Sequence, residues 1–512
     1  MDISRRKLLA GAVAAVPGAH AAGRAPNILH ILTDQQQWGT VAGRSECRTP
    51  NLNRLAESGM LFERAYTPSA VCCPARAMML SGAYHWHNGV YNQVHSPPSV
   101  HRDMNADVVL YSQRLREAGY RLGYVGKWHA SYVRTPLEFG FQEVADLAGC
   151  DPRLIRKLET NPDHVKRERG TIKSVPQRRF SWPGSQPFPM WGYRDGPEEA
   201  TPEYYRAECA IRMMQRFARG GSPWHLEVHF IQPHDPYMPL KKYLDRYDAG
   251  AIRVPASFRD TFEGKPGLHR RESETWGEFT EADYREGRAH YYAYMEQIDA
   301  QIGRVLDALK ETGQEENTIV VATTDHGDMV GAHRMWIKGW IPYEECYRVP
   351  LIVRWPGRIR PGTRSGRLVQ THDLAHTYVA AAGAKPMPYQ DGRALQPLFD
   401  DPKLEAWRDQ ILCAYYGGEF LYTQRIAITE RLKYVFNGFD IDECYDLAGD
   451  PEEMRNLVSR GERRVDVDDM RARLYELMNQ FEDPFGDLNG RGDRYCAPRY
   501  LPRGKRRAGQ AG

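Results

Sequence analysis

One short segment of the sequence combines a cysteine with residues that could activate it. Residues 67–76 read TPSAVCCPAR. Pro74 fits the first turn of a helix, so Cys72 is expected at a helix N-terminus, where free N–H groups and the helix dipole favour an anionic ligand. Arg76, one turn further along, can reach back to the same spot. The pattern predicts an activated cysteine that faces an oxyanion; the alternative is a structural cysteine pair in the core.

Four apolar runs elsewhere in the chain end abruptly in polar residues that could assist such a cysteine. These are 27–32, followed by Asp34 and Gln35; 120–125, followed by Lys127 and His129; 225–231, followed by His234; and 318–322, followed by Asp325 and His326. Each run has the length of a strand, and the β-branched residues of 318–321 favour a strand there. A solvated loop explains one such cluster, but it explains four of them poorly.

Helical patterns lie between these runs, at 49–59, 106–118 and 291–312. Strands that alternate with helices predict an α/β fold, with a large mixed, mostly parallel sheet sandwiched by helices. In such a sheet the functional site lies at the carboxyl ends of the strands. The four polar clusters are therefore expected to meet at one edge of the sheet.

The C-terminal part of the chain has a different pattern. Short apolar runs at 411–416, 425–429 and 432–436 look like antiparallel strands, and a helical pattern follows at 465–481. Together they predict a smaller α+β domain at 402–485 that carries a short antiparallel sheet.

Residues 25–401 are expected to form the catalytic domain. Two segments within it, 151–202 and 241–283, are rich in Pro, Gly, Arg and aromatic residues and show no clear periodicity. They are interpreted as insertions, and long ordered loops often serve as lids or binding walls.

Residues 1–24 have the layout of an export signal. Two adjacent arginines, Arg5 and Arg6, precede an apolar run at 8–16, and an A-x-A-like cleavage site lies at 19–21. Adjacent arginines are typical of a twin-arginine signal, so an exported protein, periplasmic or extracellular, is expected. The run is shorter than the ~20 residues that span a bilayer, and no later segment has the pattern of a membrane helix.

The overall charge argues against nucleic acid as a partner. The 512 residues include 69 Lys and Arg against 66 Asp and Glu, a formal net charge of +3. Nucleic-acid binding requires a concentrated basic face instead. The basic tail at 486–512 is expected to be a solvated terminus. Nine cysteines are scattered along the chain without zinc-finger spacing.

The cysteine motif resembles the signature of the formylglycine-dependent type I sulfatase family, a branch of the alkaline phosphatase superfamily. Cys72, Pro74 and Arg76 occupy the fixed positions of Cys-x-Pro-x-Arg, and the preceding segment 49–55 also matches. Ala75 stands where the family usually has Ser. The resemblance implies that a formylglycine-generating maturation enzyme converts Cys72 to 3-oxoalanine, also called formylglycine.

The remaining family elements recur in order along the chain. They imply a metal site of Asp34, Gln35, Cys72, Asp325 and His326, and a catalytic set of Cys72, Arg76, Lys127, His129, His234 and Lys338. Gln35 and His326 replace the commoner Asp and Asn of the two metal pairs. Carboxylate and amide oxygens suit Ca²⁺ or Mg²⁺, whereas the imidazole nitrogen shifts the preference toward Mn²⁺. The resemblance favours Ca²⁺.

The resemblance also implies a reaction, the hydrolysis of a sulfate ester to an alcohol and inorganic sulfate. The hydrate of formylglycine at position 72 would attack sulfur, while Lys127 and Lys338 neutralise the sulfate oxygens. His234, with Lys338, would protonate the departing alcohol. His129 would then take the proton of the second hydroxyl, which releases sulfate and restores the aldehyde.

Two other functions stay open at this point. The Asp-Gln and Asp-His pairs also suit a phosphonate monoester hydrolase or phosphodiesterase of the same superfamily. A non-catalytic binding protein, in which Cys72 stays a thiol, is the alternative from another class. If the protein is a sulfatase, a sulfated carbohydrate is the expected substrate, since Trp182, Trp191 and Tyr193 of the first insertion could stack on sugar faces.

Overall fold

The computed structural model describes residues 25–485, apart from 97–98, 159–170, 181–186, 339–340, 419–421 and 439. The predicted export signal, the basic tail and Trp182 lie outside the described residues.

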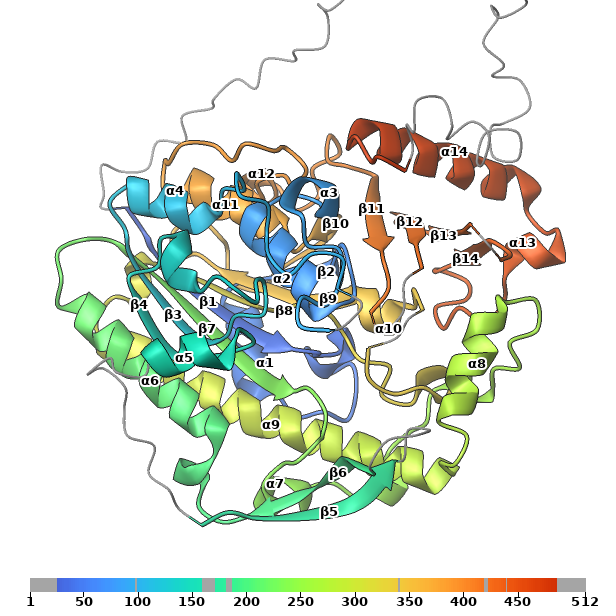
Figure 1. Cartoon of the computed structure of the whole chain (residues 1–512), viewed down its shortest axis with the longest axis horizontal. Helices are drawn as coiled ribbons and strands as arrows, with labels where there is room; N and C mark the ends of the chain where they lie inside the picture. Colours follow the sequence, from blue (N-terminus) through green and yellow to red (C-terminus); the bar gives the residue numbers. More distant parts are fainter. Residues whose placement is uncertain are drawn as a thin grey trace, which may run out of the picture.

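An eight-stranded sheet forms the centre of the molecule (Figure 1). In spatial order its strands are β10 (Thr363–Gln370), β2 (Met60–Tyr66), β9 (Arg348–Arg354), β8 (Thr318–Thr324), β1 (Asn27–Asp34), β7 (Trp224–Pro233), β3 (Arg121–Lys127) and β4 (Glu143–Ala148). β9 pairs antiparallel with β2 and β8, and the other recorded pairs of this sheet are parallel. The predicted mixed, mostly parallel sheet is confirmed.

Helices cover both faces of the sheet. One face carries α1 (Pro50–Ser58), α6 (Pro202–Ala218) and α9 (Glu281–Glu311), and the other carries α2 (Cys72–Ser81), α4 (Tyr111–Glu117), α11 (Asp373–Ala381) and α12 (Gln396–Asp400). The alternating side chains of β1 divide between the two faces, with Leu29 and Ile31 in one hydrophobic cluster and Ile28 and Leu32 in the other. Figure 1 shows α6 and α9 on one side of the sheet and α2, α4 and α11 on the other.

Two helix boundaries differ from the prediction. The helix predicted at 291–312 begins at Glu281, because Thr280 and Asp283 cap it reciprocally: the Thr280 hydroxyl accepts from the Asp283 N–H, and the Asp283 carboxylate accepts from the Thr280 N–H. The helix predicted at 106–118 begins only at Tyr111. The Gln113 side-chain oxygen accepts the N–H of Leu110, the residue before the helix.

The C-terminal unit contains the predicted second sheet. β11 (Gln410–Tyr415), β12 (Gln424–Thr429), β13 (Leu432–Asn437) and β14 (Glu443–Asp446) pair antiparallel in sequence order. α14 (Arg464–Gln480) packs on this sheet through Leu474 and Leu477, and α13 (Leu457–Arg460) precedes it. The predicted small α+β unit with a short antiparallel sheet is therefore confirmed.

The two predicted insertions have local structure of their own. Within 151–202, α5 (Pro152–Leu158) is followed by the antiparallel pair β5 (Lys173–Phe180) and β6 (Phe188–Asp195). Within 241–283 lie α7 (Lys241–Leu244) and α8 (Gly267–Thr275). The other short segments are α3 (His85–Asn88), α10 (Glu344–Tyr347), and the 3-10 turns Trp38–Thr40, Pro136–Phe139, Glu198–Ala200, Ala249–Ala251, Ala256–Arg259, Glu315–Asn317 and Ala332–Arg334.

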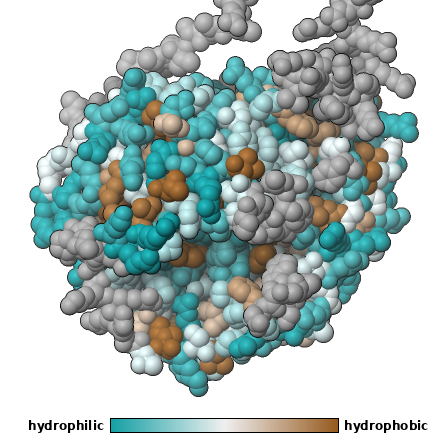
Figure 2. All heavy atoms as spheres, viewed as in Figure 1, coloured by the Kyte–Doolittle hydropathy of each residue, from teal (hydrophilic) through white to brown (hydrophobic). Residues whose placement is uncertain are grey.

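Within the described part of the chain, no helix combines the length and apolar character needed to cross a bilayer. Figure 2 shows one face as mainly hydrophilic, with its hydrophobic residues in small separate groups. Scattered apolar residues of this kind are normal for a protein surface.

Candidate active site

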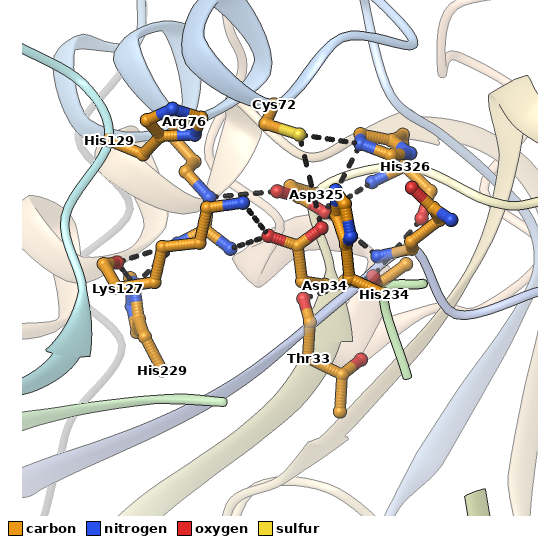
Figure 3. Close-up of polar contacts among 12 residues, drawn as sticks. Thr33, Asp34, Cys72, Arg76, Lys127, His129, His229, His234, Asp325 and His326 are labelled. Carbon is orange, nitrogen blue, oxygen red and sulfur yellow. Dashed lines mark hydrogen bonds and ion pairs between the residues drawn. The ribbon is translucent and has the colours of Figure 1, made fainter. Parts of the chain in front are cut away.

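The four predicted polar clusters meet at the carboxyl edge of the central sheet. Asp34 is the last residue of β1, and Lys127 is the last residue of β3. His234 and Asp325 directly follow β7 and β8. β8, β1, β7 and β3 are neighbours that run parallel, so their carboxyl ends lie side by side. Figure 3 shows these side chains gathered around Cys72.

Cys72 is fixed at this edge by the helix that it begins. Val71 is extended, Pro74 lies in the first turn of α2, and the helix ends at Gly82, whose φ of 65° is left-handed. Every residue of α2 is buried, and Cys72 is 0% exposed. The free N–H groups and the dipole of a helix N-terminus favour negative charge at this position.

The surroundings of the Cys72 thiol also favour an anion. Its Sγ lies 3.1 Å from His326 Nε2 and 3.9 Å from Asp34 Oδ1. Burial alone would raise the pKa of the thiol, but Lys127, Lys338 and His326 bring it well below its usual range. Cys72 therefore faces a positively charged pocket, as the sequence predicts for an activated cysteine.

Arg76 connects the two aspartates of the site. Its Nε donates to Asp325 Oδ2 at 2.8 Å, and its Nη2 donates to Asp34 Oδ2 at 3.0 Å. Its Nη1 donates to the backbone carbonyl of Lys127 at 2.7 Å. The guanidinium is 1% exposed, and three fixed acceptors hold its plane in place. Lys127 Nζ adds a second cation against Asp34.

Asp34, Cys72, Asp325 and His326 form a candidate metal site. One donor atom of each lies within 4.8 Å of the others, and all four residues are buried. Lys127 and Arg76 hold the pKa of Asp34 below its usual range despite its burial. Burial and the neighbouring Asp34 carboxylate raise the pKa of Asp325. Arg76 and Lys127 bind the Oδ2 atoms of these carboxylates. The Oδ1 atoms, each 3.9 Å from Cys72 Sγ or His326 Nε2, are left for a cation.

His326 directs its Nε2 toward this site. Its Nδ1 lies 2.8 Å from the Gly327 carbonyl, which can only accept, so Nδ1 carries a proton. Asp325 and Cys72 raise the pKa of His326 to about 9 despite its burial, so a cation that binds to Nε2 would displace a proton from it. The donor set of carboxylate oxygens and one imidazole nitrogen fits a divalent metal.

Gln35 lies beside this donor set, but its side chain is held by other partners. Its Oε1 accepts from Lys338 Nζ at 3.2 Å, and its Nε2 donates to Asp328 Oδ2 at 2.7 Å and Asp235 Oδ1 at 3.2 Å. Its backbone N–H donates to Asp325 Oδ1 of the metal site at 3.2 Å. Neither Asp235 nor Asp328 is predicted from the sequence as a partner of Gln35, although both lie in the polar motifs after β7 and β8.

Lys338 and His234 form a pair on the other side of Cys72. Lys338 Nζ lies 2.9 Å from His234 Nε2, and His234 Nδ1 lies 3.2 Å from Asp235 Oδ1. Burial lowers the pKa of His234, but Asp235, Cys72 and Asp34 together outweigh it and the net direction is upward. The pKa of Lys338 is also raised, because the negative groups around it, Cys72 and Asp235 first, outweigh its burial. An ammonium can only donate, so the contact holds one proton between Lys338 Nζ and His234 Nε2, and the pair can supply it.

His129 has the opposite character. Burial and the nearby Lys127 lower its pKa to about 3, so the imidazole is neutral at pH 7 and can accept a proton. Its Nε2 lies 2.8 Å from His95 Nδ1, and the two rings stack with centroids 4.6 Å apart. His95 was not predicted, because the sequence around it carries no motif that would place it beside His129.

Of the aromatic residues proposed to stack on a substrate, Trp191 lies in the hydrophobic core. Trp191 is 0% exposed and packs against Phe279 and Trp336, with ring centroids 5.3 and 5.2 Å away. It is part of the core and cannot reach a substrate, so that suggestion is wrong for Trp191. Tyr193 is partly buried, with Lys241 Nζ 6.0 Å from its ring.

The comparisons with known proteins agree with this geometry. The sequence model of the family described as "Sulfatase" matches residues 26–384, and that described as "N-sulphoglucosamine sulphohydrolase, C-terminal" matches residues 331–480. The first match covers more than half of the chain. The chain therefore belongs to the sulfatase family, which confirms the resemblance in the cysteine motif and the hydrolase class that it implies.

Relatives and solved structures cover nearly the whole chain. "Uncharacterized sulfatase YidJ" of Escherichia coli K12 is 29% identical over 472 residues, which cover 90% of this chain and 88% of the relative. A solved protein in complex with its substrate D-glucosamine-2-N,6-O-disulfate has a TM-score of 0.73 at 23% identity, over 91% of this chain and 100% of that chain. The phosphonate monoester hydrolase of Agrobacterium radiobacter has a TM-score of 0.71 at 23% identity, over 89% of this chain and 96% of that chain. At these identities the two structures show the shared fold.

Proposed function

We propose that this sulfatase uses a formylglycine nucleophile made from Cys72. The observation that carries the proposal is the position of the Cys72 side chain at the buried start of α2, with His326 Nε2 3.1 Å from its sulfur. Sγ marks the place of the aldehyde oxygen after conversion. Cys72, Pro74 and Arg76 also hold the three positions of the motif that the maturation enzyme of the family recognises.

Asp34, Asp325 and His326 would hold a divalent metal beside this nucleophile, with Gln35 at its edge. The bound cation offsets the charge of the sulfate group and polarises one of its oxygens. Ca²⁺ is the first choice, since two carboxylates and an amide suit a hard cation. Mn²⁺ is favoured by His326 Nε2, and Mg²⁺ is the third candidate.

The side chains around Cys72 fit the steps of sulfate ester hydrolysis. One hydroxyl of the aldehyde hydrate attacks sulfur, the S–O bond to the alcohol breaks, and the enzyme keeps a covalent sulfate ester. Lys127 and Lys338 lie where they can neutralise the sulfate oxygens. The leaving oxygen takes the proton that His234 Nε2 shares with Lys338 Nζ, 2.9 Å away.

His129 completes the cycle. With a pKa of about 3 it is neutral at pH 7, so it can remove the proton from the remaining hydroxyl of the intermediate. The C–O bond to the sulfate group then breaks, inorganic sulfate leaves, and the aldehyde is restored. A serine or an unconverted cysteine could not release sulfate in this way, because neither has the second hydroxyl.

Phosphonate or phosphodiester hydrolysis is the second candidate. It is favoured by the Asp34-Gln35 and Asp325-His326 pairs and by the fold shared with a phosphonate monoester hydrolase. Purified enzyme should be assayed on 4-nitrophenyl sulfate and on a phenyl phosphonate ester. The proposal predicts the higher kcat/KM for the sulfate; a much higher value for the phosphonate would reverse the assignment.

We infer that the substrate is a sulfated carbohydrate. The inference is supported by the solved protein of the same fold that binds D-glucosamine-2-N,6-O-disulfate. A panel of sulfated mono- and oligosaccharides, compared with small aryl and choline sulfates, tests it. Activity on the sugar esters is expected, and activity confined to the small esters would contradict the inference.

We also propose that the protein is exported through a twin-arginine signal at its N-terminus, which would place it in the periplasm or outside the cell. Arg5 and Arg6 followed by the apolar run are the basis. Replacing both arginines by lysine should keep the full-length protein in the cytoplasmic fraction. Equal export of this variant and the wild type would contradict the proposal.

A further inference from the structure

A buried carboxylate with no lysine or arginine beside it lies behind the active site. Glu227 is in the middle of β7 and is 0% exposed. Its recorded ion-pair partners in the described chain are three histidines: His30 Nδ1 at 2.9 Å, His225 Nε2 at 2.9 Å, and His229 Nε2. The Tyr111 hydroxyl also donates to it. Isolated buried charges are costly, and the recorded hydrogen bonds from Tyr111, His225 and His229 compensate for this one. His30 Nδ1 is close but makes no recorded hydrogen bond among the described residues.

These contacts determine which nitrogen of His229 carries a proton. An ionised carboxylate can only accept, so His229 Nε2 must be the donor. Burial would raise the pKa of Glu227, but His30 and His229 bring it to about 2, and the group is ionised at pH 7. Burial lowers the pKa of His229 to about 4, so the imidazole is neutral. Its Nδ1 is therefore unprotonated and accepts hydrogen bonds.

The bare Nδ1 of His229 faces Arg76. Arg76 Nη1 lies 3.1 Å from it, the Tyr124 hydroxyl 2.6 Å and the Lys127 carbonyl 3.1 Å. Arg76 Nη1 and Tyr124 also donate to that carbonyl, so these two donors can bridge the two acceptors. Figure 3 shows His229 below Lys127, on the side of Arg76 away from Cys72. If His229 carried its proton on Nδ1 instead, that N–H would oppose the N–H groups of the guanidinium. Arg76 would then lose an acceptor and face an opposing donor in the orientation in which it contacts Asp34 and Asp325.

We propose that Glu227 and His229 are positioning residues for catalysis, because the carboxylate fixes the His229 tautomer that accepts from Arg76 and so orients Arg76 between the two aspartates. The inference builds on the proposed function, since it assigns a role at the same active site. Carboxylates orient histidines in the same way in metal sites and catalytic triads, and here the oriented histidine contacts the guanidinium of Arg76.

The tautomer can be tested without any activity. NMR of the full chain labelled with ¹⁵N-histidine, with His229→Asn to assign the signal, reports which ring nitrogen is protonated. We expect a neutral His229 with its proton on Nε2 in the wild type. A proton on Nδ1, or a doubly protonated ring, would overturn the proposal even if the enzyme is a sulfatase. Absence of sulfatase activity in the wild type would contradict the proposed function alone.

Kinetics then test the consequence for Arg76. His229→Asn keeps an amide oxygen near the place of Nδ1, whereas His229→Leu keeps no acceptor. We expect His229→Leu and Glu227→Gln to lower kcat on 4-nitrophenyl sulfate by about 10- to 100-fold, and His229→Asn by clearly less. Equal kcat for the Asn and Leu variants of His229 would overturn the proposal, because a packing role does not depend on the acceptor.

His225→Gln is the matched control. His225 hydrogen-bonds the same carboxylate but has no recorded contact with Arg76, so this variant should lose stability with little loss of kcat. A kcat as low as that of Glu227→Gln would overturn the proposal. The histidines and Glu227 also have the donor atoms of a metal site. The members of that group are His30, Glu227 and His229. A second bound metal per chain, lost in His30→Gln, would show that Glu227 is a ligand and would likewise overturn the proposal.

Discussion

His326 Nε2 lies 3.1 Å from Cys72 Sγ, while its Nδ1 is bound to the Gly327 carbonyl 2.8 Å away. The imidazole is thereby fixed with Nε2, the nitrogen that a metal ion would bind, toward the nucleophile position and the two aspartates. This relationship distinguishes the site from one built of oxygen donors alone, and it bears directly on metal choice.

Replacing that nitrogen by an oxygen should change the metal preference. His326→Asn offers an amide oxygen, so we expect the ratio of activity with Mn²⁺ to activity with Ca²⁺ to fall relative to the wild type. The enzyme would be stripped with a chelator, dialysed and assayed with each ion, and its metal content measured. The exposed His101→Asn serves as the control. An unchanged ratio would show that His326 is not a ligand.

Removing Lys127 should weaken the reaction strongly. Lys127 forms an ion pair with Asp34 and lowers the pKa of the Cys72 side chain. We expect Lys127→Ala to lower kcat/KM on 4-nitrophenyl sulfate by about 10²- to 10³-fold, the usual cost of losing a group that stabilises developing charge. Lys242→Ala, at a half-exposed surface ion pair, is the control. A loss below about threefold would argue against contact between Lys127 and the sulfate group.

The role of His234 predicts a dependence on the leaving group. A general acid matters more for a basic alkoxide than for 4-nitrophenolate. His234→Gln should therefore lose more kcat on a sugar sulfate than on 4-nitrophenyl sulfate. Asp235 and Cys72 raise the pKa of His234 despite its burial, and a general acid must be protonated, so wild-type activity on the sugar ester should fall as the pH rises through that raised pKa. Equal losses on both substrates would contradict proton donation by His234.

Asp299 on α9 should make stability depend on pH. Its carboxylate accepts the N–H groups of Asn51 and Leu52 at the start of α1, at 2.9 and 2.8 Å. Burial raises its pKa from 3.8 to about 6. The folded state thus favours the protonated form, and its contribution to stability is full below 3.8 and is lost as the pH rises through about 6.

The comparison with Asp299→Asn isolates this effect. The free energy of unfolding, measured with urea at several pH values, should fall for the wild type relative to the variant between pH 3.8 and about 6. A difference between the two proteins that stays constant over this interval would show that the pKa of Asp299 is not raised.

The sequence predicts those parts of the site that follow apolar strands. Asp34, Lys127, His234 and Asp325 could be found because a buried run ends where a polar cluster begins, and parallel strands bring such ends together. His95 could not, because its place beside His129 depends on how a loop folds over the site.

The roles of Glu227 and His229 and the burial of Trp191 were not predicted from the sequence. Glu227 and His229 lie inside the run that predicts β7, at alternate positions of the strand. Their spacing shows that they share a face with His225, but only the fold shows that Arg76 reaches His229. Trp191 is expected from the sequence to stack on a sugar. That expectation is wrong because Trp191 is buried against Trp336, a contact that depends on long-range packing.

The measurement that tests the central claim most directly is the mass of the peptide containing Cys72. The chain should be co-expressed with a formylglycine-generating enzyme, digested and analysed by mass spectrometry. Conversion of Cys72 to formylglycine predicts a peptide lighter by about 18 Da than the unmodified one, together with sulfatase activity that is lost in Cys72→Ala. An unshifted peptide from enzyme that still hydrolyses sulfate esters would contradict the account.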